Sequence, residues 1–140
     1  DVARVDRGTR WVRPHTSRRL HAGCFVARVV GRSMEPTLAD GAWAIFSRRV
    51  SARPIGRVVI AQYGGLVDDD TAASYTVKRF YATAAPRGAE TPWSEVRLEP
   101  DNASFKPIVV GGDRLGDLAI VAELVEVLDP TSSAPKTKAP

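Results

Sequence analysis

Short runs of β-branched and aromatic residues, separated by segments that contain Gly, Pro or Asp, limit most strongly how this chain can fold. Such runs, bounded by turn residues, are typical of β-strands. They occupy residues 24–30, 42–47, 55–63, 74–82, 95–98, 107–110 and 118–128. The last run fits both strand alternation and a helical stripe, and its β-branched residues favour a strand. Many short strands with little helix predict a mainly β, compact, barrel-like fold.

The ends of the chain differ in composition from its middle. At 140 residues, the chain is long enough for one domain, which we place at residues 24–129. Residues 1–23 are predicted to form an irregular basic arm, anchored by Trp11 and Val12, because six arginines fall within the first twenty residues. Residues 130–140 have no apolar face to bury, so we expect them to be disordered.

The basic arm raises the question of nucleic-acid binding. Clustered arginines attract phosphates without sequence preference. No helix-turn-helix, zinc-finger or RNP pattern accompanies them. We therefore interpret the arm as a solvated segment. Nucleic acid is expected to bind weakly to the arm, or through a domain outside this chain.

Several functional classes are disfavoured by the composition. The single cysteine, Cys24, excludes an internal disulfide and suits a reducing cytoplasm. His15, His21 and Cys24 match no metal-site spacing, and residues 68–70 (DDD) lack the Gly and Glu of a calcium loop. No apolar run approaches the roughly 18 residues of a membrane span. We expect a cytoplasmic protein with no metal, no cofactor and no membrane attachment.

The residues that carry potential chemistry are Ser33 and, 45 positions later, Lys78. A serine hydroxyl needs a base to become a nucleophile, and a lysine amine serves as that base if burial lowers its pKa. In a strand over residues 74–82, Lys78 shares its face with Thr76 and Phe80 and points away from Arg79. That environment suits a neutral amine. Taken alone, the pair is a weak signal, and a lysine on a solvated face is the competing interpretation.

Three sequence blocks in order strengthen the interpretation: residues 31–41 (GRSMEPTLADG), 75–80 (YTVKRF) and 98–110 (LEPDNASFKPIVV). They resemble the peptidase domain of the LexA/UmuD-type S24 family, relatives of bacterial signal peptidase I, over about residues 24–128. The resemblance implies that Ser33 is the nucleophile and Lys78 the general base. It also implies that the Arg32 and Ser33 backbone N–H groups hold the oxyanion. Met34 would pack beneath the site, and Asn102, Phe105 and Pro107 look like scaffold.

What the resemblance implies for function is a Ser–Lys endopeptidase in a bacterial regulatory, stress or defence setting. Its substrate would be its own upstream segment or a tethered partner polypeptide. Family members cut an Ala-Gly bond, but Ala22-Gly23 lies only ten positions before Ser33 and is interpreted as a decoy. Residue 1 falls where the product of such a cleavage would begin. The insert at 64–74 is expected to cover or extend the cleft.

A second hypothesis stays open at this point. The same scaffold, without catalysis, would act as a sensor or as a dimerisation or interaction module of a larger protein. A homodimer formed through the end of the sheet is expected under either hypothesis, because family members often pair there.

Overall fold

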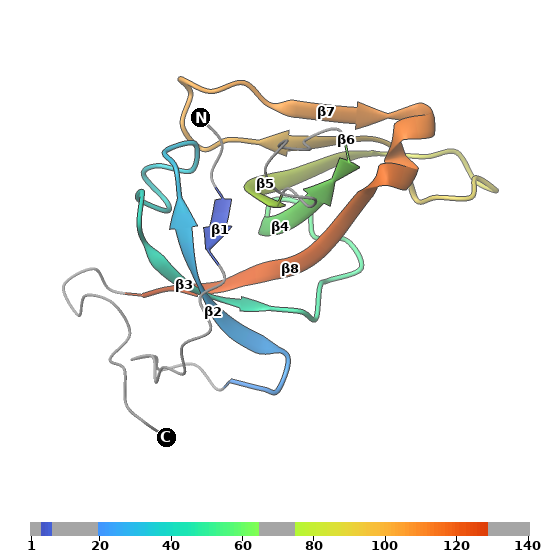
Figure 1. The fold of residues 1–140 in the computed structure, drawn as a ribbon. Coiled ribbons are helices and arrows are strands. Elements are labelled where there is room, and N and C mark those ends of the chain that lie inside the picture. The colour runs from blue at the N-terminus through green and yellow to red at the C-terminus, as the bar shows by residue number, and fades with distance from the viewer. Residues whose placement is uncertain (1–3, 7–19, 65–74, 129–140) are drawn as a thin grey trace.

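Eight strands form one antiparallel sheet in the computed structural model, which describes residues 4–6, 20–64 and 75–128 (Figure 1). The strands are β1 (Arg4–Asp6), β2 (Cys24–Val30), β3 (Trp43–Ser47), β4 (Val58–Tyr63), β5 (Tyr75–Ala84), β6 (Trp93–Glu99), β7 (Ile108–Gly111) and β8 (Leu118–Val127). A short 3-10 helix, η2 (Gly112–Asp117), precedes β8. The order across the sheet is β1-β2-β3-β8-β4-β5-β6-β7. The prediction of a mainly β, barrel-like fold with little helix is confirmed.

All seven runs predicted to be strands form strands, with ends displaced by three residues at most. The predicted irregular arm differs from the structure at residues 4–6, which form β1 and pair with the edge of β2. Edge strands offer unpaired main-chain N–H and C=O groups to any neighbouring segment, whatever its side chains. The predicted anchors Trp11 and Val12, the insert beyond Gly64 with its three aspartates, and the tail at 130–140 lie outside the described residues.

Strand β8 joins the two halves of the sheet. It pairs with β4 through its first half and with β3 through its second half. The register skips Val121 on the β4 side and Val125 on the β3 side. A bulge inserts an unpaired residue and bends the strand, so both skips curve β8. They also interrupt the alternation of side chains, which explains why this run fits two periodicities.

The core lies on both faces of the curled sheet. On β4, Val58 and Ile60 belong to one buried cluster, and Val59 and Ala61 belong to the other. Successive residues of a strand point to opposite faces, so β4 is covered on each side. The first cluster also contains residues from the turn after β2, which is therefore packed onto the sheet.

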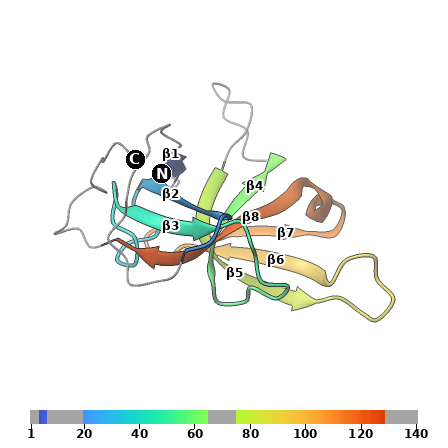
Figure 2. The same cartoon turned by 90° about the horizontal axis from the view of Figure 1, so that it is seen from below.

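The curl brings distant parts of the sheet together. Four strand spacings separate β2 from β5 in the sheet, which would amount to about 19 Å if the sheet were flat. Instead, β1–β3 and β4–β7 fold towards each other around β8 (Figures 1 and 2), and β1 lies against β5 as well as pairing with β2. The turn that follows β2 can therefore meet side chains of β5.

The assignment of faces on β5 predicts unequal effects of two neighbouring substitutions. Phe80 is 1% exposed and packs edge-to-face on Trp93, whereas Tyr81 is 40% exposed. We expect Phe80→Ala to lower the free energy of unfolding by about 3–5 kcal/mol, because it leaves a cavity. Tyr81→Ala should cost less than about 1 kcal/mol. Urea unfolding measures both, and equal losses would contradict the assigned faces.

Candidate active site

Ser33 lies in the tight turn that follows β2. The turn begins at Gly31, whose φ of 108° is one that residues with side chains rarely adopt. The Gly31 N–H donates to Asp40 Oδ1 at 2.9 Å, and the Leu38 N–H donates to Met34 O at 2.9 Å. Met34, a residue of the same turn, is completely buried in the first core cluster, and Ser33 is completely buried as well. The turn is thus closed by its own hydrogen bonds and anchored by the methionine.

Lys78 lies on β5, and its side chain is directed into the protein. It is 2% exposed. Its Nζ lies 2.9 Å from Ser33 Oγ, 2.9 Å from Thr76 Oγ1 and 3.1 Å from Val77 O. The two residues singled out in the sequence, 45 positions apart, are therefore in direct contact. Thr76 is a further member of the site, and its position two residues before Lys78 on the same strand face was the signal for it.

The electrostatics of Lys78 follow from its burial. Removal from water disfavours the ammonium and lowers the pKa of Lys78 from 10.5 to about 8. None of the ion pairs among the described residues includes Lys78. With that pKa, about one tenth of the amine is neutral at pH 7.

The three partners of Lys78 suit a neutral amine. A neutral amine has two N–H donors and one lone pair. Val77 O can only accept a hydrogen bond, and Thr76 Oγ1 can accept the second N–H. The lone pair then faces the Ser33 hydroxyl, which can donate its proton. Deprotonation of Lys78 therefore allows the Ser33 hydroxyl to donate a hydrogen bond to Nζ.

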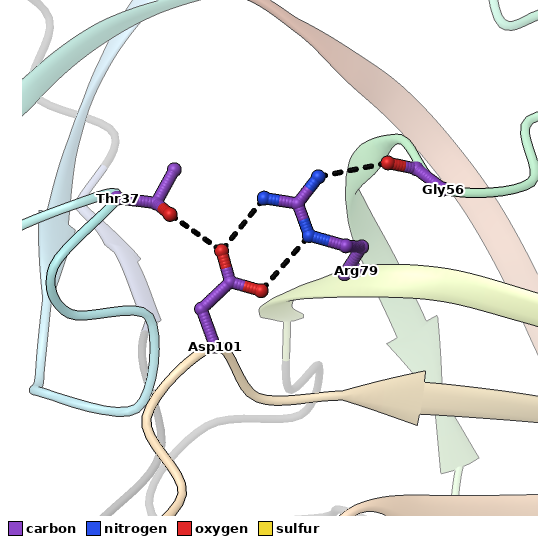
Figure 3. A network of polar contacts seen from close by, with 4 residues as sticks. All are labelled: Thr37, Gly56, Arg79 and Asp101. Carbon is purple, nitrogen blue, oxygen red and sulfur yellow. Dashed lines mark hydrogen bonds and ion pairs between the residues drawn. The ribbon is translucent and has the colours of Figure 1, made fainter.

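A second polar network is formed by Arg79, Asp101, Thr37 and Gly56 (Figure 3). Arg79 forms two hydrogen bonds with the Asp101 carboxylate, at 2.9 and 2.7 Å, and its Nη1 donates to Gly56 O at 2.8 Å. Thr37 Oγ1 also donates to Asp101. The Arg79 guanidinium, together with the Thr37 hydroxyl, holds the pKa of Asp101 below its usual value. This network connects β5, next to Lys78, with the turn that carries Ser33.

Asn102 contacts the turn that carries Ser33 directly. Its main-chain N–H donates to Ser33 O at 3.0 Å, and its Nδ2 donates to Arg32 O at 3.0 Å. Its Oδ1 accepts from the Ser104 N–H. The sequence indicated only a scaffold role for Asn102, and it missed Asp101. Two adjacent polar residues in the third sequence block were the available signal.

A separate serine–histidine pair lies at the start of β2. His21 Nδ1 accepts a hydrogen bond from the Gly23 N–H, so the proton of the neutral ring is on Nε2. Nε2 lies 3.1 Å from Ser47 Oγ and donates to it. His21 therefore cannot take the hydroxyl proton of Ser47. The pair closes the turn before β2 and does not form a second nucleophilic site.

Three further findings concern membrane-spanning helices and the relatives of the chain. Within residues 4–6, 20–64 and 75–128, no helix is long and apolar enough to cross a membrane. A search of curated proteins found no match to the chain. The sequence does match the family described as Peptidase S24-like over residues 4–125. The match includes β1, so it begins earlier than the domain start at residue 24 that the sequence indicated. It also spans both Ser33 and Lys78, and the chain therefore belongs to the S24-like peptidase family.

Proposed function

We propose that this chain is a serine endopeptidase in which Lys78 activates Ser33. The observation that carries the proposal is the 2.9 Å contact between Lys78 Nζ and Ser33 Oγ inside the protein. Burial supplies the lowered pKa that a lysine base requires. Ser–Lys pairs are a known variant of the serine-nucleophile arrangement.

The proposed reaction has two stages. Neutral Lys78 accepts the Ser33 proton while Oγ attacks the carbonyl carbon of a peptide bond. The Arg32 and Ser33 N–H groups stabilise the oxyanion, each contributing on the order of 3 kcal/mol. Lys78 then transfers the proton to the leaving nitrogen, the C–N bond breaks, and an acyl-enzyme remains. Water, deprotonated by Lys78, hydrolyses the ester and regenerates Ser33.

The burial of the dyad favours a tethered substrate. Ser33 is fully buried and Lys78 is 2% exposed, so a peptide carbonyl reaches Oγ only after a local rearrangement. A segment joined to the chain has a high effective concentration and can exploit brief openings. Free peptides in dilute solution have no such advantage. We propose that the substrate is an upstream segment of the same polypeptide or a tethered partner, in a bacterial regulatory setting.

The Ala22-Gly23 bond is a poor candidate for the scissile bond. It precedes β2, and Ser33 follows β2. Seven residues of extended strand span about 23 Å, which separates this bond from the hydroxyl. The Gly23 N–H is also held by His21.

The first test is cleavage of the product of the complete gene, expressed with whatever it encodes ahead of Asp1. Ser33→Ala should slow cleavage by on the order of a thousandfold or more. Ser104→Ala, a change at an exposed serine, should leave the rate unchanged. N-terminal sequencing and mass spectrometry identify the products. Identical products from the wild type and Ser33→Ala would refute the proposal and favour a non-catalytic interaction module.

The pH dependence of cleavage should report the titration of Lys78. Because the neutral amine is the active form, the rate should rise about tenfold per pH unit below about 8 and level off above it. Lys78→Met should abolish cleavage at every pH. A rate that stays flat between pH 6 and about 9 would contradict the role of Lys78 as base.

Stability should depend on pH through the same group, independently of activity. The pKa of Lys78 is lower in the folded state, so between about pH 8 and 10.5 the unfolded chain binds more protons. The free energy of unfolding of the wild type should therefore rise across this window relative to Lys78→Met, by up to about 3 kcal/mol in total. Urea unfolding of both proteins at several pH values measures the difference. A difference that stays constant with pH would show that folding does not lower the pKa of Lys78.

A further inference from the structure

One residue outside the dyad holds the main chain on both sides of the Ser33 amide. The side chain of Asn102 donates to the Arg32 carbonyl, and its main-chain N–H donates to the Ser33 carbonyl, each at 3.0 Å. Two consecutive carbonyl groups of the turn that carries Ser33, the nucleophile turn of the proposed peptidase, thus accept hydrogen bonds from a single residue in the segment between β6 and β7.

The geometry of the peptide bond gives these contacts a consequence. A trans peptide is planar, so its C=O and the following N–H point in opposite directions. The donor that fixes the direction of the Arg32 carbonyl therefore also fixes the direction of the Ser33 N–H. An oxyanion donor has to lie about 2.7–3.1 Å from the developing charge, so its direction affects the rate.

We propose that Asn102 is a positioning residue that sets the direction of the Ser33 N–H for oxyanion stabilisation. This inference rests on the proposed peptidase function. The Glu35 N–H also donates to Arg32 O, at 3.1 Å, but Glu35 belongs to the same turn and would move with it. Asn102 belongs to the segment between β6 and β7, so its hydrogen bonds fix the turn relative to the sheet.

The residue before Asn102 makes that anchor rigid. Asp101 is held by the paired hydrogen bonds from Arg79, which is adjacent to the base on β5, and by Thr37 of the nucleophile turn (Figure 3). A bidentate arginine–carboxylate pair restricts both distance and orientation. The dipeptide Asp101–Asn102 thus connects the strand that carries the base to the turn that carries the nucleophile.

Two substitutions of Asn102 separate the donor from the rest of the side chain. Asn102→Asp keeps the size and the Oδ1 acceptor for the Ser104 N–H, but loses the donor to Arg32 O. Asn102→Ala also loses the donor and introduces no charge. An effect that both variants share is due to the lost hydrogen bond. Ser104→Ala is the matched control, because it retains the main-chain N–H that bonds to Asn102.

The first measurement is structural. Residual dipolar couplings of backbone N–H groups report their directions in solution. We expect the coupling of the Ser33 N–H to change in both Asn102 variants and to stay unchanged in Ser104→Ala, while couplings within β4 and β5 remain as in the wild type. An unchanged Ser33 coupling in both Asn102 variants overturns the inference, whether or not the protein cleaves anything.

The second measurement is the cleavage rate of the complete gene product. Both Asn102 variants should cleave about tenfold more slowly than the wild type. This loss is smaller than the loss expected from deletion of an oxyanion donor, because the hydrogen bond from the Glu35 N–H to Arg32 O remains. The midpoint near pH 8 should persist in Asn102→Ala, since the base is untouched. General damage to the fold would not reduce the cleavage rate while leaving the couplings within β4 and β5 and the midpoint of the pH profile unchanged.

The two proposals fail in different ways. Cleavage that depends on Ser33 but not on Asn102 overturns the positioning role and leaves the peptidase intact. Absence of any Ser33-dependent cleavage overturns the peptidase and, with it, the oxyanion role of Asn102. In that second case, a changed Ser33 coupling would identify Asn102 as an anchor of the turn alone.

Discussion

The enclosure of one lysine amine against one serine hydroxyl is the constraint on which the rest of this structure depends. An ammonium group taken out of water is costly unless it finds partners or loses its proton. In this fold, Lys78 has hydrogen-bond partners and also a pKa that allows it to lose its proton. Ser33, Thr76 and Val77 O satisfy its hydrogen bonds, and burial lowers its pKa to about 8. The same burial that destabilises the charged form raises the share of neutral amine at a given pH.

The pKa values of Lys78 and Arg79 shift in opposite directions because these neighbouring residues point to opposite faces of β5. Lys78 is enclosed, and its pKa falls. Arg79 is paired with the Asp101 carboxylate, which raises the pKa of the guanidinium and keeps it charged. A carboxylate on the inner face would have stabilised the ammonium of Lys78. Strand alternation thus places the Arg79–Asp101 ion pair on the face of β5 opposite the Lys78 amine.

The curvature of the sheet brings Lys78 and Ser33 into contact. Its two halves meet along β8, where the skipped residues Val121 and Val125 mark the bends. The curl that follows places the turn after β2 next to β5, although three strands lie between β2 and β5 in the sheet. Asp101 and Asn102 follow β6. Through their hydrogen bonds to Arg79 and Arg32, they link β5 to the turn after β2. The position of the dyad is therefore a property of the curvature of the sheet.

Local pattern was enough to predict much of this arrangement. Alternation predicted the strands and placed Lys78 on the same face as Thr76, and the three sequence blocks predicted the S24-like family. Strand periodicity depends on neighbours along the chain, so it is written in the sequence. It failed where main-chain groups decide the pairing, as at β1, since those groups are the same in every residue.

Contacts between distant segments were decided only by the tertiary structure. The sequence paired Ser33 with Lys78 weakly through their chemistry and more strongly through the family resemblance, and it assigned Asn102 to the scaffold. Whether the amine reaches the hydroxyl depends on the bends in β8 and on the packing of the turn into the core through the Met34 side chain. The hydrogen bonds of Asn102 to Arg32 and Ser33 have the same origin, because they cross some 70 residues of chain. Periodicity identifies which way a side chain points, whereas folding in three dimensions determines what it meets there.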